Sequence, residues 1–315
     1  MKYASFVYNL QAAPLSFDFC NFLGYCRIIS KVEGFERYGV VLDARNQRAL
    51  GQVEGSYSTN WSARKLDSLI DCARLCPAIE LLSIVNRDAL IPEEVALPRR
   101  HFFNRVPYYF KDLVDLCSKH EIGILSLRNL FEPNQEYCEM YKRRLPQRTV
   151  AFHLRNCPFN SSRNAPLNIF QDAIAKLRKR GVNCIVVGDV DSFVFGSDSV
   201  SREDLSVPFP APSFDVKQRF NLAAAATLNV TWGGGFAHPF WLSTVPYLSF
   251  GLLNPTVSFN TMAALESKGP FPRRQFPWAL PCSQQLNWTP ASETSSKTIV
   301  DAVVNILEGD QETVE

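Results

Sequence analysis

Three stretches of the sequence place polar or glycine residues directly after an apolar run, where they could bind an anion. The first is His153-Leu154-Arg155-Asn156. Alternation along a strand would put His153 and Arg155 on one side, with the arginine entering the following loop. A guanidinium binds a phosphate through two hydrogen bonds and offsets its charge. We therefore predict a phosphate contact for Arg155. The alternatives are an arginine that ties its loop to a carboxylate and a core histidine whose hydrogen bonds are satisfied.

The second stretch reads WGGGFAHP and contains Gly233, Gly234, Gly235 and His238. Three glycines between a strand and a helix let the backbone come close to a ligand. The helix beyond them presents free N–H groups and the positive end of its dipole to an anion. The stretch matches neither GxGxxG nor GxxxxGK[ST], and a loop without a ligand is the alternative.

The third stretch is Gly188-Asp189, at the end of a predicted strand rich in β-branched residues. Glycine permits a tight turn there, and the aspartate can cap that turn or bind a ligand hydroxyl. A plain turn is the alternative. Asp189 and Asp191 also form a DxD pattern, but two carboxylates alone are weak evidence for a metal site. We expect no bound metal.

Strands and helices that alternate along the chain must position these stretches. The predicted strands are residues 3–10, 39–42, 80–85, 122–127, 149–154, 183–187, 228–231 and 245–250. The predicted helices are residues 16–32, 60–76 (capped by Asn60 or Ser62), 107–120, 167–180, 214–227, 236–243 and 297–307. This alternation indicates an α/β protein with parallel sheets covered by helices. Ligands of such sheets bind beyond the carboxyl ends of the strands, where all three stretches fall.

A charged linker with Pro133 and Pro146 divides the chain into two halves. We predict two Rossmann-like domains, residues 1–146 and 147–315, which face each other across a cleft.

The composition is that of a globular protein, with 46% hydrophobic and 20% charged residues among 315. The net charge of +2 argues against a broad polyanion-binding face, so we expect no nucleic-acid partner. The basic clusters, such as Arg143-Arg144 and Lys176 to Arg180, are interpreted as solvated helix ends. Nine cysteines without paired spacing and four histidines outside any ligand pattern favour free thiols in the cytoplasm over a zinc site. The opening residues indicate a strand, and no segment reaches the roughly 18–20 apolar residues of a membrane span.

The segment from Val150 to Asp189 resembles the nucleotide-sugar-binding half of GT-B glycosyltransferases. It reads AFHLRN, then SSRNAPLNIFQDAIAKLRKRG, then IVVGD, and is similar to surface-carbohydrate glycosyltransferases of bacteria, which carry an Arg-Asn-Ala loop like that at Arg163. Fucosyltransferase-like enzymes use a related H-x-R-x-x-D motif whose arginine contacts the donor diphosphate. Arg155 matches that arginine, whereas the aspartate of the motif is absent. The N-terminal SFVYNLQAAPLSFDFCNFL resembles the opening strand and acceptor-side helix of the same enzymes.

The resemblance implies an enzyme that moves a sugar from a nucleotide-sugar donor to a glycan or lipid-linked acceptor, with no metal and no cofactor. The implied donor-binding residues are His153, Arg155, Asn156, Arg163, Asn164, Gly188, Asp189, Gly233, Gly234, Gly235 and His238. Arg155 and backbone N–H groups would stabilise the diphosphate that leaves. Asp18 is the candidate catalytic base, with a helix cap as the alternative, and Asp43 is a weaker candidate.

A second class of function stays open: a module that binds a nucleotide or phosphosugar without catalysis. A nicotinamide-dependent oxidoreductase would need a GxGxxG loop after a first strand, and neither half has one. Peripheral membrane association also stays open, because the acceptors of such enzymes are often lipid-linked.

Overall fold

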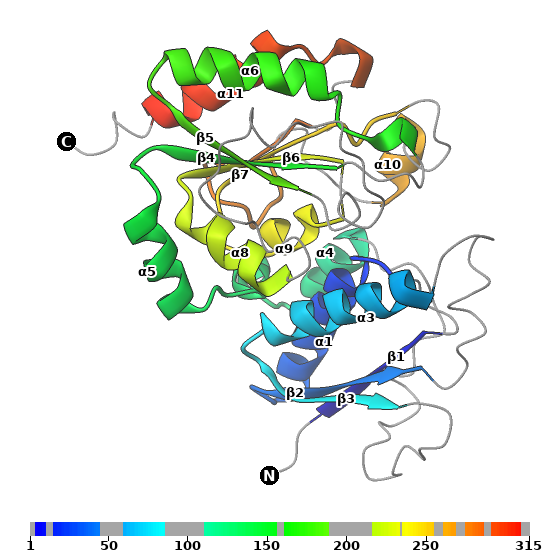
Figure 1. The fold of residues 1–315 in the computed structure, drawn as a ribbon. Coiled ribbons are helices and arrows are strands. Elements are labelled where there is room, and N and C mark those ends of the chain that lie inside the picture. The colour runs from blue at the N-terminus through cyan, green and yellow to red at the C-terminus, as the bar shows by residue number, and fades with distance from the viewer. Residues whose placement is uncertain are drawn as a thin grey trace. The chain divides into compact units, whose positions relative to one another are not determined.

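The computed structural model describes residues 4–10, 15–44, 59–85, 110–155, 161–188, 216–233, 235–254, 261–268, 275–286 and 291–309. The chain forms two compact units, Met1–Glu132 and Pro133–Glu315 (Figure 1). The sequence placed the boundary at Pro146 instead. Helix α5 (Gln135–Arg144) lies before that proline and packs against α8 (Val216–Ala225) of the second unit.

The first unit is built on a parallel sheet of three described strands in the order β1-β2-β3. These strands are β1 (Ala4–Asn9), β2 (Tyr38–Asp43) and β3 (Ile79–Val85). The described helices of the unit are α1 (Phe19–Val32), α3 (Thr59–Arg74), α4 (Phe110–Lys119) and the 3-10 helix η2 (Ile124–Asn129). Tyr8 of β1 packs edge-on to Phe19 of α1, with ring centroids 4.9 Å apart, and such aromatic contacts hold α1 on the sheet.

Two predictions for the first unit are wrong. Residues 122–127 do not form a strand, because Leu127 and Leu130 are both buried and their spacing of three suits the 3-10 helix η2. Helix α3 starts at Thr59, so Asn60 and Ser62 lie inside the helix and not at the position before its first residue.

The second unit has a five-stranded parallel sheet in the order β5-β4-β6-β7-β8. The strands are β4 (Thr149–Leu154), β5 (Asn183–Gly188), β6 (Leu228–Trp232), β7 (Tyr247–Phe250) and β8 (Gln284–Gln285). The helices besides α5 and α8 are α6 (Leu167–Lys179), α9 (Ala237–Trp241), α10 (Met262–Lys268) and α11 (Ser296–Gly309), with 3-10 helices η3 (Ser161–Arg163) and η5 (Ala291–Glu293). The predicted helix over residues 236–243 is therefore the short α9.

Helices cover both faces of this sheet, as Figure 1 shows, with α6 and α11 on one face and α5 and α8 on the other. Phe152 of β4 packs with α6 and α11 in one core cluster, and its neighbour Ala151 packs with α5 and α8 in another. Every residue of β4 is buried, which explains why the strand reads as a continuous apolar run.

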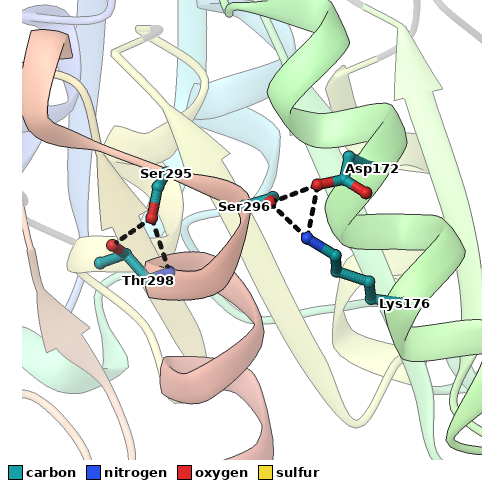
Figure 2. A network of polar contacts seen from close by, with 5 residues as sticks. All are labelled: Asp172, Lys176, Ser295, Ser296 and Thr298. Atoms are coloured by element: carbon teal, nitrogen blue, oxygen red, sulfur yellow. Dashed lines mark hydrogen bonds and ion pairs between the residues drawn. The ribbon is translucent and has the colours of Figure 1, made fainter.

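A polar contact joins α6 and α11 at the surface (Figure 2). Lys176 Nζ lies 2.6 Å from Asp172 Oδ2 and donates a 3.0 Å hydrogen bond to Ser296 Oγ, which in turn donates to Asp172. The neighbouring Ser295 accepts a hydrogen bond from the backbone N–H of Thr298 and thereby caps α11.

The strand order contains a switch point. From β4 the chain passes through α6 to β5 on one side, and β6 then lies on the other side of β4. Crossovers that leave in opposite directions open a crevice at the carboxyl ends of the two strands involved, here β4 and β6. Among the helices described, none has the length and apolar content needed to cross a membrane.

Candidate functional site

The candidate site lies at the carboxyl ends of β4, β5 and β6. Arg155 directly follows β4, Gly188 ends β5, and Gly233 directly follows β6. Leu154, the last residue of β4, pairs with Gly188 on one side and with Trp232 on the other. The fold therefore brings three of the predicted positions to adjacent strand ends, although their ligand roles stay predictions.

The loop that follows β4 folds back onto these strand ends. Arg155 is 8% exposed and donates a hydrogen bond through Nη1 to Asn164 Oδ1, while its carbonyl accepts a 2.9 Å hydrogen bond from the N–H of Ala165. Arg163 donates through Nη2 to the carbonyl of Gly233 at 3.0 Å. The two arginines and Asn164 thus bind protein groups and hold the loop against the end of β6. One partner of Arg155 in this loop is thus the side-chain amide of Asn164.

Glycine is required at two positions beside this loop. Gly233 has a φ of +48°, and a Cβ atom there would lie 3.0 Å from the carbonyl oxygen of Gly251. Gly251, directly after β7, has a φ of +72°, and its Cβ atom would overlap the indole of Trp232. Both conformations are unfavourable for any residue with a side chain. Three backbone segments therefore approach one another closely at this edge of the sheet.

His153 is buried beneath the site, on the α8 face of the sheet, with 5% exposure. Its Nε2 lies 2.9 Å from Asn229 Oδ1. The Nδ2 group of Asn229 donates to two backbone carbonyls, of Ala223 at 2.9 Å and of Pro246 at 3.0 Å. Because carbonyls only accept, the orientation of the amide is fixed, and its oxygen must accept from His153. The proton of the imidazole therefore sits on Nε2.

The surroundings of His153 keep the ring neutral. The pKa of His153 is lowered to about 3, chiefly by burial and also by the positive charge of Arg219, whereas the hydrogen bond to Asn229 acts in the opposite direction. Phe236 and Phe240 pack against the ring, with centroids 5.4 and 4.9 Å away. A neutral, enclosed imidazole cannot attract a phosphate by charge. The side chain instead supports the residues that follow the triglycine loop.

Arg219 is a residue of this region that the sequence analysis missed. It lies on α8 with 2% exposure, and its guanidinium carbon sits 3.9 Å from the centroid of the Phe236 ring. This stacking puts a positive charge one residue away from the triglycine loop. The sequence does contain a sign of a buried arginine. In the segment VKQRFNLAAA, Arg219 lies on an otherwise apolar face of the helix, four residues before the alanine run.

His238 contacts the last glycine of the triglycine stretch, Gly235. The helix α9 that carries it is only five residues long. His238 Nδ1 lies 2.9 Å from the carbonyl oxygen of Gly235, and the ring packs against Trp241 with centroids 4.6 Å apart. The contact orients the backbone of Gly235.

The two candidate bases belong to the first unit. Asp18 occupies the N-cap position of α1, but its side chain makes no capping hydrogen bond and accepts instead from Ser16 Oγ at 2.7 Å. Asp43 is the last residue of β2 and is 6% exposed. Asp43 thus ends a strand, and Asp18 begins the helix that comes after β1. The half-buried Asp18 is the better placed for contact with a substrate.

Some predicted residues lie outside the described part of the chain, namely Asn156, Asp189, Asp191 and Gly234. Within that part, no group of three or more histidine, cysteine, aspartate or glutamate side chains is arranged to hold a metal ion. The eight cysteines that the structure describes are free thiols.

No family model matches the sequence, and no curated protein matches it. Several solved structures match the chain, and two with a similar fold are described next. A glycosyl transferase family 9 protein from Veillonella parvula superposes with a TM-score of 0.60 at 12% identity, over 98% of each chain. The ADP-heptose LPS heptosyltransferase II of E. coli superposes with a TM-score of 0.52 at 12% identity, over 98% of this chain and 100% of the other.

At this identity the similarity establishes the fold, and the more distant resemblance to fucosyltransferases stays a prediction. The prediction that rested on Arg155, the Arg163 loop and the N-terminal strand and helix is confirmed for the fold: this chain has the two-domain α/β fold of GT-B glycosyltransferases.

Proposed function

We propose that this protein is a glycosyltransferase that transfers a sugar from a nucleotide-sugar donor to a hydroxyl acceptor. One observation carries the proposal. Arg155 and Gly233 follow the two strands that flank the switch point of the second sheet, and the intervening loop joins them through Asn164 and Arg163. A guanidinium beside closely packed glycine backbone is suited to a diphosphate.

The proposed mechanism depends on the charges that develop when the donor is cleaved. Cleavage of the bond between the anomeric carbon and the phosphate oxygen leaves both electrons on the diphosphate, and the sugar gains oxocarbenium character. Arg155 and backbone N–H groups after β6 would stabilise the growing negative charge, without a metal or cofactor. The acceptor hydroxyl attacks the anomeric carbon and loses its proton to a base, for which we propose Asp18. Neutral His153 takes no part in proton transfer.

For the donor we propose a nucleotide diphosphate sugar, and the similarity to an ADP-heptose transferase makes ADP-heptose the first compound to test. For the acceptor we propose a glycan or a lipid-linked sugar. We further propose that the protein works in the cytoplasm, that it associates with membranes peripherally, and that nucleic acid is not a partner.

The test is a calorimetric titration of the full chain with nucleotide diphosphates and their sugars, followed by an assay for slow donor hydrolysis. Arg155→Ala should weaken binding of the preferred diphosphate at least about tenfold, since a charge-assisted hydrogen bond is lost. Asn164→Ala, which removes the partner of Arg155 without removing charge, should weaken it less. Arg143→Ala, an exposed arginine at the other end of the sheet, should leave it unchanged.

Unchanged affinity in the Arg155→Ala protein would refute the assignment of the donor site. Tight binding without hydrolysis or transfer, over a panel of sugar and lipid-linked acceptors, would favour the non-catalytic binding module.

A further inference from the structure

The described part of the second unit carries a cluster of positive charge at the end of the sheet opposite to the candidate site. Helix α5 ends at Arg144 shortly before β4 starts at Thr149, and α6 ends at Lys179 shortly before β5 starts at Asn183. The two strands are neighbours, their first residues are paired, and Asn183 Nδ2 donates to Thr149 Oγ1 at 2.8 Å. Both helix ends therefore lie beside the amino-terminal ends of β4 and β5, on the left of this unit in Figure 1.

Eight basic side chains occupy these two helix ends, in the stretches KRRLPQR (142–148) and KLRKR (176–180), and neither stretch contains a carboxylate. Three of the eight have partners: Lys142 pairs with Glu139, Lys176 with Asp172, and Arg178 donates to the carbonyl of Cys184. The side chains of the remaining five are all exposed and form no hydrogen bond or close ion pair among the described residues, although the charge of Lys179 contributes to the lowered pKa of Asp172. We call Arg143, Arg144, Arg148, Lys179 and Arg180 the basic edge.

The charge of the basic edge is not balanced by the neighbouring helix. Helix α11, which packs beside α6, carries two exposed carboxylates, Asp301 and Glu308, against five cations. Charges of one sign on the same part of a surface repel one another, and an anionic partner would reduce this repulsion. In the sequence the two clusters lie more than 25 residues apart, and each by itself is interpreted as a solvated helix end. Only the pairing of β4 with β5 places them together.

We propose that the basic edge binds the surface of a membrane that contains acidic phospholipids. Long, mobile lysine and arginine side chains on an exposed edge suit many weakly placed headgroups, each of which attracts a nearby cation. Neither stretch contains an aromatic side chain on which a nucleic-acid base could stack. The candidate site lies at the carboxyl-terminal ends of the strands, away from the basic edge. Membrane contact at the basic edge would therefore leave Arg155 and Gly233 uncovered.

The test is co-sedimentation of the full chain with vesicles of phosphatidylcholine alone and of phosphatidylcholine mixed with phosphatidylglycerol. The wild-type protein should bind only the acidic vesicles and should dissociate as salt is raised. A variant with Arg143→Gln, Arg144→Gln, Lys179→Gln and Arg180→Gln should bind at least about 100-fold more weakly, since each cation contributes roughly fivefold. Arg148 is left in place because its φ is +56°.

A control variant loses the same charge elsewhere. Its changes are Arg37→Gln, Lys111→Gln, Lys119→Gln and Lys297→Gln, all at exposed positions. This protein should bind acidic vesicles within about threefold of the wild type, because these cations lie outside the basic edge. A second variant, with arginines 143, 144 and 180 changed to lysine, keeps the charge and should also bind.

Equal losses in the basic-edge and control variants would overturn the proposal, because they would show a dependence on net charge alone. Binding without preference for acidic vesicles would overturn it too, as would release of the protein from vesicles by an equal charge concentration of duplex DNA. Diphosphate titration of the basic-edge variant, which should match the wild type, separates this outcome from failure of the proposed transferase function.

Discussion

Asn229 fixes the proton of His153 on Nε2, across the paired strands β4 and β6. The two side chains meet at 2.9 Å, and the amide has no freedom to turn because both its protons are donated to carbonyls. This arrangement locks the end of β4, where Arg155 follows, to the strand that leads into the glycine loop. His153 is therefore a neutral residue of the core, although a histidine so close to a candidate site could be mistaken for a catalytic residue.

The neutral state of His153 predicts how stability depends on pH. The pKa is lowered from 6.5 in the unfolded chain to about 3 in the folded protein, so both states are neutral above pH 6.5. Below pH 6.5 the unfolded state binds a proton that the folded state does not, and the free energy of unfolding falls. At pH 5 the loss from this residue should be about 2 kcal/mol. Urea unfolding at pH 7 and pH 5 measures it.

The variant for this experiment is His153→Gln, whose amide can still donate to Asn229. Its unfolding free energy should fall less than that of the wild type between pH 7 and pH 5, by the amount above. The matched control is His120→Gln in the first unit, which removes a histidine and leaves His153 and Asn229 in place. Parallel pH dependences in wild type and His153→Gln would show that the imidazole titrates normally in the folded state.

Alanine should destabilise the protein more at Gly251 than at Gly181. Both have positive φ angles, +72° and +76°, so alanine at either position costs about 1–2 kcal/mol of backbone strain. At Gly251 the new methyl group also overlaps Trp232, which should add about 2 kcal/mol, whereas the space beside Gly181 is open. Denaturant midpoints of Gly251→Ala and Gly181→Ala test the difference. Equal midpoints for the two variants would show that Trp232, at the end of β6, can move aside for the new methyl group.

Arg163 should affect donor binding by holding the loop rather than by its charge. Arg163→Ala removes the 3.0 Å hydrogen bond to the carbonyl of Gly233 and should lower diphosphate affinity, at a cost of about 1 kcal/mol in stability. Arg163→Lys keeps the charge without the forked geometry and should restore little. Asn254→Ala, which breaks the 2.9 Å hydrogen bond to the carbonyl of Ser162 in the same loop, should have a similar effect. Full affinity in Arg163→Lys, measured by calorimetry, would instead indicate direct contact with the phosphate.

Asp18 should be needed for transfer but not for the stability of α1. Its carboxylate makes no capping hydrogen bond, so Asp18→Asn should leave the unfolding midpoint nearly unchanged. If Asp18 is the base, the transfer rate at saturating donor should fall by about 100-fold or more. Ser16→Ala, which removes only the hydroxyl that donates to Asp18, should reduce the rate much less. A variant that loses stability and keeps its rate would establish the structural role alone.

Most elements of the fold could be predicted from the sequence, because local signals determine them. The buried run of β4 and the stripe of α6 follow from the pattern of apolar residues. The helix predicted over residues 167–180 is followed by Gly181, whose φ of +76° suits the position just after a helix. The prediction failed at residues 122–127, where a short apolar run is compatible with more than one backbone conformation and tertiary burial of Leu127 decided the outcome.

The sequence by itself also determined which positions end strands, and hence that Arg155, Gly188 and Gly233 lie at the carboxyl edge of a sheet. Only the tertiary structure decided that β6 pairs with β4, since strand order depends on contacts between residues far apart in the chain. That pairing brings Asn229 to His153, fixes the tautomer, and buries Arg219 under Phe236. The pairing of β4 with β5 likewise joins two separate basic stretches into one edge. Residue types supply the chemistry, but their partners, protonation states and combined charge arise from long-range packing.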